Sequence, residues 1–298
     1  MSETASPTQP DPAPAKHPDL IFDLGMHRGE DTQFYLAKGF RVIAFEADPD
    51  LVNQCRERFA AELTTGQLRI VAGAIVADPD AASVTFYKNP VVTVWGTTDP
   101  AWQARNARMG WESEEITVPA VNFTRCLREF GVPYFIKIDI EGADLLCLRS
   151  LAKCAERPDY VSIESSKTAL TAIAEELDIL EQLGYTAFKA VQQATIPGTR
   201  APRPAREGAD INYVMEYDAS GLFGRDLPGP WLDRADIERQ YRRIFWGYRV
   251  FGNDTFMRTN RYARKLWRVL QRITRRPIPG WYDTHARHGS VAEQDGLN

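Results

Sequence analysis

One stretch, residues 19–40, most constrains what this chain can fold into. It consists of an apolar run, a loop that contains Gly25 and Gly29, and an amphipathic segment that ends at Gly39. This order predicts a buried strand, a tight loop and a helix. Such a unit opens nucleotide-binding α/β sheets, in which the ligand lies over the loop and the helix N-terminus.

Apolar strands and helix-length segments alternate through the rest of the chain up to residue 217. The predicted strands are 41–45, 68–71, 84–87, 134–138, 160–163, 187–191 and 211–217, with 84–87 beside the main sheet. The predicted helices among them are 49–59, 123–130, 143–154 and 168–183. Strands separated by helices imply βαβ units and a mainly parallel, doubly wound sheet with helices on both faces.

The composition divides the chain into three parts. Residues 1–18 are rich in Pro, Ala, Ser and Thr and are expected to be a disordered leader. Residues 19–217 would form the α/β domain. Residues 218–298 would form a helical C-terminal extension, in which Asp233 caps one helix. A second helix there has a basic face across 261–276, which is either solvated or applied to a membrane surface.

Residues 88–115 have no clear period and contain Trp95, Trp102 and Trp111. They form either a lid or substrate-facing segment, or part of the core. His285 and His288 belong to the C-terminal tail, where we expect them to be solvated.

Bulk properties exclude several classes of protein. Hydrophobic residues make up 44% and charged residues 26% of the chain, and the net charge of -4 argues against a general nucleic-acid binder. There is no apolar run long enough for stable membrane insertion and no N-terminal signal core, so we expect a cytoplasmic protein. Four cysteines without CxxC spacing, Cys55, Cys126, Cys147 and Cys154, are expected to be buried thiols rather than disulfides or zinc ligands.

Acidic side chains follow the predicted strands at the edge where ligands bind to parallel sheets. In strand order, the residues at these ends are Asp23 with Gly25, Glu46, Gly73 with Ala74, Asp139 with Glu141, and Glu164. Each acid alone is as readily a helix cap or a surface group. A set of carboxylates along one edge suits a ligand rich in hydroxyl and amino groups.

Glu46 indicates the kind of ligand. It closes the second predicted strand 23 residues after Asp23 (46 − 23), near the spacing at which an acid accepts the hydrogen bonds of a ribose diol. The first loop, however, has a GxxxG spacing from Gly25 to Gly29 rather than GxGxxG, and Asp23 would repel a pyrophosphate. A phosphate-free adenosine compound with a positive end, S-adenosylmethionine, therefore fits better than NAD.

The sequences IFDLGMHRGEDT, VIAFEADPDL, VAGAIVADPDAASVTFY and YFIKIDIEGAD resemble those of FkbM-type S-adenosylmethionine-dependent methyltransferases, over roughly residues 19–217. The resemblance implies a Rossmann-like, seven-stranded sheet. It places Asp23, Gly25 and Gly29 at the methionine end of the cofactor, Glu46 at the ribose, Gly73 and Ala74 near the adenine, and Asp139 at the reacting end. Met26 and Ala47 are also expected to bind the cofactor. The family commonly has Asn where Met26-His27 stand, so His27 is a departure.

An alcohol acceptor must lose its proton, and a positioned base typically contributes roughly 10²–10⁴-fold to such a step. The candidate bases are Asp139, Glu141 and His27, although His27 is also placed to cap the following helix. The carboxylates could bind a divalent metal, but no His joins them at ligand spacing, so no metal is expected. Lys137 is expected to pair with one of the acids in a strand-end salt bridge.

These observations lead to the hypothesis of an S-adenosylmethionine-dependent O-methyltransferase that acts on a hydroxyl of a sugar or secondary metabolite. The hydroxyl acceptor follows from the resemblance alone. The partner would be a small molecule rather than nucleic acid, and the C-terminal extension could support an oligomer. The alternative is a non-catalytic binding or scaffold protein that keeps the same fold.

Overall fold

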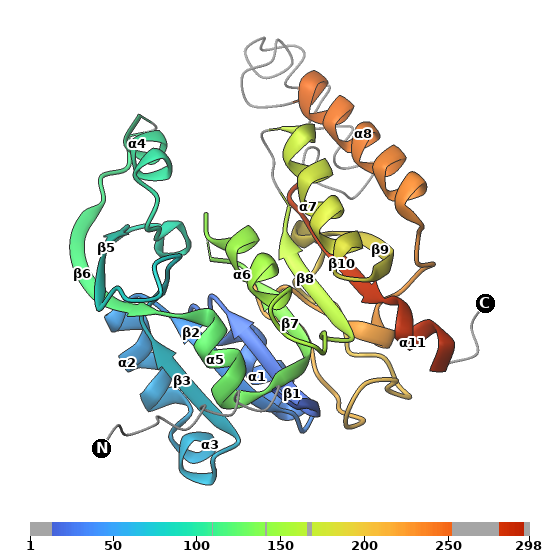
Figure 1. The fold of residues 1–298 in the computed structure, drawn as a ribbon, viewed down its shortest axis with the longest axis horizontal. Helices are drawn as coiled ribbons and strands as arrows, with labels where there is room; N and C mark the ends of the chain where they lie inside the picture. Colours follow the sequence, from blue (N-terminus) through green and yellow to red (C-terminus); the bar gives the residue numbers. More distant parts are fainter. Residues whose placement is uncertain (1–13, 109, 141, 166–168, 252–279, 295–298) are drawn as a thin grey trace, which may run out of the picture.

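The computed structural model describes residues 14–108, 110–140, 142–165, 169–251 and 280–294. Its centre is a seven-stranded sheet with the order β3-β2-β1-β7-β8-β10-β9 (Figure 1). The strands are β1 (Lys16–Leu24), β2 (Arg41–Glu46), β3 (Leu68–Ala72), β7 (Val132–Ile138), β8 (Tyr160–Glu164), β9 (Tyr185–Gln192) and β10 (Tyr282–His288). β10 runs antiparallel to both of its neighbours, and the other strand pairs are parallel. The expected seven-stranded, mainly parallel sheet is confirmed.

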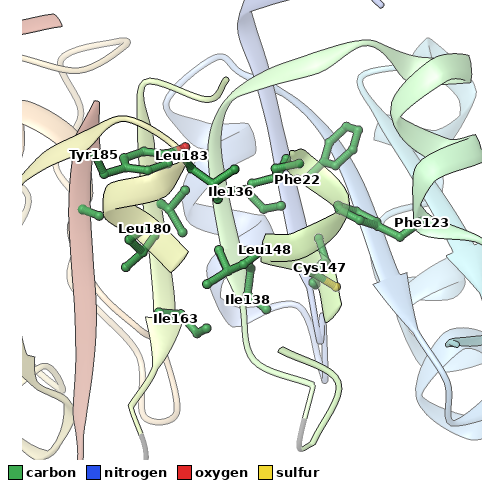
Figure 2. Close-up of a cluster of buried hydrophobic side chains, with 14 of the residues drawn as sticks. Phe22, Phe123, Ile136, Ile138, Cys147, Leu148, Ile163, Leu180, Leu183 and Tyr185 are labelled. Carbon is green, nitrogen blue, oxygen red and sulfur yellow. The ribbon is translucent and has the colours of Figure 1, made fainter. Parts of the chain in front are cut away.

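Helices cover both faces of this sheet because neighbouring residues of a buried strand point to opposite sides. Phe22 packs against Phe123 and Phe130 of α5 (Phe123–Phe130). It belongs to a core cluster that also contains residues of α6 (Asp144–Leu151), α7 (Leu170–Gln182) and α8 (Arg234–Phe251). Figure 2 shows part of this core, where Phe22 and Phe123 lie at one side and Leu180 at the other. Ile21 packs instead with α1 (Glu30–Ala37) and α2 (Pro49–Arg58).

The remaining short elements connect these layers or extend them. They are α3 (Ala60–Thr65), η2 (Gln193–Thr195), η3 (Gly224–Asp226) and α11 (Gly289–Gln294). The cap predicted from sequence is present: Asp233 accepts from the amide of Asp236 at the start of α8. Asp48, which was not predicted to be a cap, accepts from the amide of Asp50 at the start of α2. All four cysteines are buried free thiols, as expected.

A second, three-stranded sheet stands beside the main one, with the order β4-β6-β5. It consists of β4 (Ala74–Ile75), β5 (Ser83–Lys88) and β6 (Glu114–Val121). β5 was predicted, whereas β6 and the helices η1 (Thr93–Trp95) and α4 (Pro100–Arg108) were not. Trp95 packs edge-on against Trp111, and Arg105 lies over the ring of Trp102, so these tryptophans pack within this appended unit.

The seventh strand of the main sheet comes from an unexpected part of the chain. Residues 211–217 were predicted to be this strand, but they form only an isolated bridge between Arg200 and Val214. β10 takes the place between β8 and β9. The prediction of a purely helical extension is therefore wrong at 282–288, and the prediction of a solvated His285 is wrong because that residue is 2% exposed.

The chain termini depart from expectation in other ways. β1 begins at Lys16, so residues 16–18 belong to the sheet rather than to a disordered leader. Residues 1–13 and the basic segment within 252–279 lie outside the described residues. In the part of the chain that is described, no helix combines the length and apolar character needed to cross a membrane.

A buried acid joins α7 to the inserted strand β10. Glu176 is 3% exposed, and no described residue hydrogen-bonds to its Oε1. Nearby, the hydroxyls of Ser165, Tyr241 and Thr284 hydrogen-bond to one another. Burial raises the pKa of Glu176 to about 8, while Thr284 and Ser165 oppose this shift.

We expect Glu176→Gln to flatten the decline in stability between about pH 4.5 and pH 8. A carboxyl group whose folded pKa is raised stabilises the fold below its unfolded pKa, and this contribution is lost as pH rises through the folded pKa. The wild type should therefore lose up to about 1.4 kcal/mol per pH unit relative to the variant across this range. Urea unfolding at pH 5, 6.5 and 8 measures the difference. Glu175→Gln, at the exposed neighbouring position, is the control and should change nothing. Parallel pH curves for wild type and Glu176→Gln would contradict the assignment.

Candidate functional site

The carboxyl ends of β1, β2, β3 and β7 surround one cavity. It is lined by Gly25, His27, Phe45, Glu46, Ala47, Leu51, Gly73, Ala74, Ile75, Phe86, Thr93, Val94, Gly96, Thr98, Asp139, Ile140 and Ala143. Most of the site residues predicted from sequence are therefore brought together. Gly25, Glu46, Ala47, Gly73, Ala74, Asp139 and His27 are in the lining, and Glu141 is outside the described residues.

Gly25 is required by the close approach of two strand ends. Its φ is +84°, and a Cβ atom there would lie 1.8 Å from the carbonyl oxygen of Asp139. Its amide and that of Met26 both donate to the carbonyl of Phe45, at 3.0 and 2.9 Å. The backbone of the first loop thus approaches the ends of β2 and β7 directly, because Gly25 has no side chain that would separate them.

Glu46 organises the same loop through its carboxylate. One oxygen accepts from the amide of His27 at 2.8 Å and the other from the amide of Asp48 at 2.9 Å. The side chain is largely buried, and burial raises its pKa, while the two amides favour the charged form. Each carboxylate oxygen can accept about two hydrogen bonds. Both oxygens therefore keep acceptor capacity for a ligand in the cavity.

Asp23 has a structural position rather than a place in the cavity lining. It is fully buried and accepts from the Thr32 hydroxyl at 2.6 Å. Burial raises its pKa to about 6, which Lys137 opposes from 3.5 Å. Met26 and Gly29 are also absent from the lining. Gly29 leaves room for Phe59, whose ring would be 2.3 Å from a Cβ atom at position 29.

Lys137 connects the buried acids with the exposed one. Its Nζ lies 3.5 Å from Asp23, 3.4 Å from Asp31 and 3.7 Å from Asp139, and it donates to the carbonyl of Gly25 at 3.0 Å. Burial lowers the pKa of Lys137, but the three carboxylates outweigh it and hold this pKa well above its ordinary value. The predicted strand-end salt bridge is confirmed, with more partners than expected.

His27 lines the cavity but has partners for both ring nitrogens. Its Nε2 lies 2.8 Å from the Thr93 hydroxyl and its Nδ1 lies 3.5 Å from Glu30. Its φ is 52°, in the left-handed region. The expectation that it caps α1 is wrong, because the N-cap is Gly29 and no side chain bonds there.

Asp144 is a residue that sequence reasoning missed. It is the last letter of KIDIEGAD, and its carboxylate accepts from the amides of Ile140 and Gly142, both at 3.1 Å. Burial raises its pKa, which these amides oppose. An Asp at the start of a predicted helix is a capping signal that could have identified it. Thr93 was missed as well, and the segment around it carried no period.

The lining fits the cofactor expected from the sequence. Glu46 offers acceptor capacity for a ribose diol, and Gly25 leaves backbone room beside it. Leu51, Ala74, Ile75 and Phe86 provide apolar surface, of the kind that covers an adenine ring. Among the described residues, no group of three or more His, Cys, Asp or Glu is placed to hold a metal ion.

Comparison with solved structures finds methyltransferases at low identity. The O-methyltransferase from Bacillus cereus in complex with SAH is 11% identical, with a TM-score of 0.35, over 58% of this chain and 67% of that one. The precorrin-6y C5,15-methyltransferase from Geobacter metallireducens is 11% identical, with a TM-score of 0.32, over 60% and 70% of the two chains. These identities are too low to indicate the acceptor. No curated protein matches the chain in sequence.

A family match covers the part of the chain that builds the cavity. The methyltransferase FkbM domain matches residues 23–187, which is more than half of the 298 residues. The matched region contains every residue of the cavity lining. The chain therefore belongs to the FkbM family of S-adenosylmethionine-dependent methyltransferases.

Proposed function

We propose that this chain is an O-methyltransferase that methylates a hydroxyl group of a small molecule, a sugar or a secondary metabolite. The observation that carries the proposal is that Glu46 and Asp139 line one cavity on either side of Gly25. The hydroxyl acceptor rests on the sequence resemblance described above.

In this proposal Glu46 accepts hydrogen bonds from the ribose, and Gly73 and Ala74 lie beside the adenine. The bound cofactor supplies a methyl group on a sulfonium, which is transferred by in-line displacement. Alignment and exclusion of water would contribute most of the acceleration, about 7–11 kcal/mol in favourable intramolecular cases. Residues 93–98 would help to exclude water from the cavity, because Thr93, Val94, Gly96 and Thr98 are part of its lining.

Asp139 is the residue we propose as the base for the acceptor hydroxyl. Its side chain is 41% exposed and lies in the cavity lining, with Lys137 at 3.7 Å. An exposed carboxylate at that place can reach a substrate proton. His27 lies in the same lining, but its ring is committed to Thr93 and Glu30. Glu141 remains a candidate from sequence alone.

S-adenosylhomocysteine should bind the purified wild type in a calorimetric titration, because the cavity offers both an acid for the ribose and an apolar surface for the base. Glu46→Gln should weaken this binding by about 1.5–3 kcal/mol, the range for a hydrogen bond to a charged group. Glu57→Gln, on the exposed side of α2, is the control and should bind as the wild type does.

A thermodynamic cycle that combines Glu46→Gln with 2′-deoxy-S-adenosylhomocysteine shows whether Glu46 contacts the ribose or only keeps the first loop in place. If Glu46 contacts the ribose, loss of the 2′-hydroxyl costs the wild type more than it costs Glu46→Gln. Equal losses would show that Glu46 acts only on the loop. A wild type that binds no S-adenosylhomocysteine would refute the proposed function.

Gly25→Ala should destabilise the protein more than Gly66→Ala does, and should also reduce S-adenosylhomocysteine affinity at least tenfold. Both glycines have positive φ, +84° and +77°, for which a side chain costs roughly 1–2 kcal/mol. Only at Gly25 does the added Cβ meet backbone, the carbonyl of Asp139, whereas nothing lies within 4 Å at Gly66. Urea unfolding and calorimetry on both variants test this. Equal destabilisation would show that the loop relaxes freely around position 25.

A further inference from the structure

The beginning of β10 lies at the same edge of the sheet as the cavity. β10 runs antiparallel to β8, so its first residues stand beside the carboxyl end of β8. Asp283 pairs with Glu164 of β8 on one side and with Val191 of β9 on the other. The amide of Ser165 donates to the carbonyl of Tyr282 at 3.0 Å, which fixes this end of the strand.

The strand register puts Asp283 on the same face of the sheet as Lys137 and Glu164. Lys137 pairs with Ser162, which pairs with His285, and residues paired in register point to the same face. Asp283 is two residues from His285, and Glu164 is two residues from Ser162. Both side chains therefore lie on the same face of the sheet as the side chain of Lys137. The charges that act on the Asp283 carboxylate confirm the placement, since they come from Asp139, Glu164, Lys137 and Asp31.

Asp283 is buried, and its carboxylate has no partner in the part of the chain that the structure describes. It is 5% exposed, and no hydrogen bond or ion pair reaches its carboxylate from the described residues. Burial, together with repulsion from Asp139 and Glu164, raises its pKa well above the ordinary value, and Lys137 opposes this shift only in part. A buried carboxyl group left unpaired costs folding free energy, so a structural role does not account for it.

The order of the strands indicates which part of the reaction Asp283 faces. Along this edge of the sheet, the strands lie in the spatial order β3, β2, β1, β7, β8 and β10. The proposed adenine and ribose contacts, Gly73 and Glu46, are at β3 and β2, and Asp139 follows β7. The acceptor must approach the far end of the cofactor, and β8 and β10 are the next strands in that direction. Asp283 therefore lies beyond Asp139 along this edge, outside the residues that line the cavity itself.

We propose that Asp283 is an acceptor-binding residue: its carboxylate receives a hydrogen bond from a hydroxyl or amino group of the methyl acceptor, beside Asp139. This assignment rests on the proposed function of the cavity. It names the class of acceptor as neutral or cationic molecules that carry hydrogen-bond donors. Acceptors that present a phosphate or carboxylate at this point are excluded by repulsion from Asp283, Glu164 and Asp139.

Sinefungin is a suitable probe because it replaces the sulfonium methyl of the cofactor by a protonated amine, which would point toward the acceptor side. We compare its affinity with that of S-adenosylhomocysteine by calorimetry, in the full-length wild type and in Asp283→Asn. The wild type should prefer sinefungin, and Asp283→Asn should lower this preference at least fivefold with little change in S-adenosylhomocysteine affinity.

Asp159→Asn is the matched control. Asp159 directly precedes β8, so this substitution makes the same chemical change at the opposite edge of the sheet. Its preference should equal that of the wild type. An unchanged preference in Asp283→Asn, with S-adenosylhomocysteine still bound, would overturn the assignment. A wild type that binds neither ligand would refute the proposed function instead.

Thermal unfolding gives a second readout that needs no ligand. Asp283→Asn should unfold at the same temperature as the wild type or at a higher one, since it removes a buried carboxyl group that has no partner among the described residues. A clear decrease in the unfolding temperature would show that the carboxylate serves the fold, and would overturn the assignment.

Discussion

The ion pairs of Lys137 are the interaction on which the rest of the site depends. One ammonium group joins β1 through Asp23, α1 through Asp31, the first loop through the Gly25 carbonyl, and the cavity through Asp139. Buried charges are tolerated only when they are paired and hydrogen-bonded. The carboxylates that sequence reasoning assigned together to one ligand therefore divide into two groups. Asp23 holds the lysine from within, together with Asp31, which sequence reasoning had not assigned to the ligand, while Asp139 is left exposed to the cavity.

One of the acids that hold Lys137, Asp31, also binds a segment of the chain beyond residue 217. Asp31 accepts from the amide of Ser220 at 2.9 and 3.1 Å, so the segment 218–221 is bound to the first helix. Phe223 packs nearby against Tyr35 and Phe135. The residues beyond 217 thus take part in the core of the α/β unit, although composition suggested a separate extension.

Much of the fold and of the site could be predicted from sequence because the signals were local. Apolar runs separated by helix-length segments gave six of the seven main strands, and the strand-end residues Gly25, Glu46, Gly73 and Asp139 proved to share one cavity. β10 could not be found in this way. Its residues Asp283, Thr284 and His285 are polar, and only the neighbouring strands β8 and β9 make them buried. β6 was missed because it begins with two glutamates and contains Pro119, residues that are not typical of the interior of a strand.

The position of β10 after β8 and β9 in the chain also has a consequence for folding. β8 and β9 do not pair with each other, and the strand that joins them ends at residue 288 of 298. Until β10 has taken its place between them, β8 and β9 expose unsatisfied backbone edges of the kind that invite aggregation. Non-local pairing of this sort also slows folding. The sheet is therefore completed only when β10 pairs with both of these strands, however early the first βαβ unit forms.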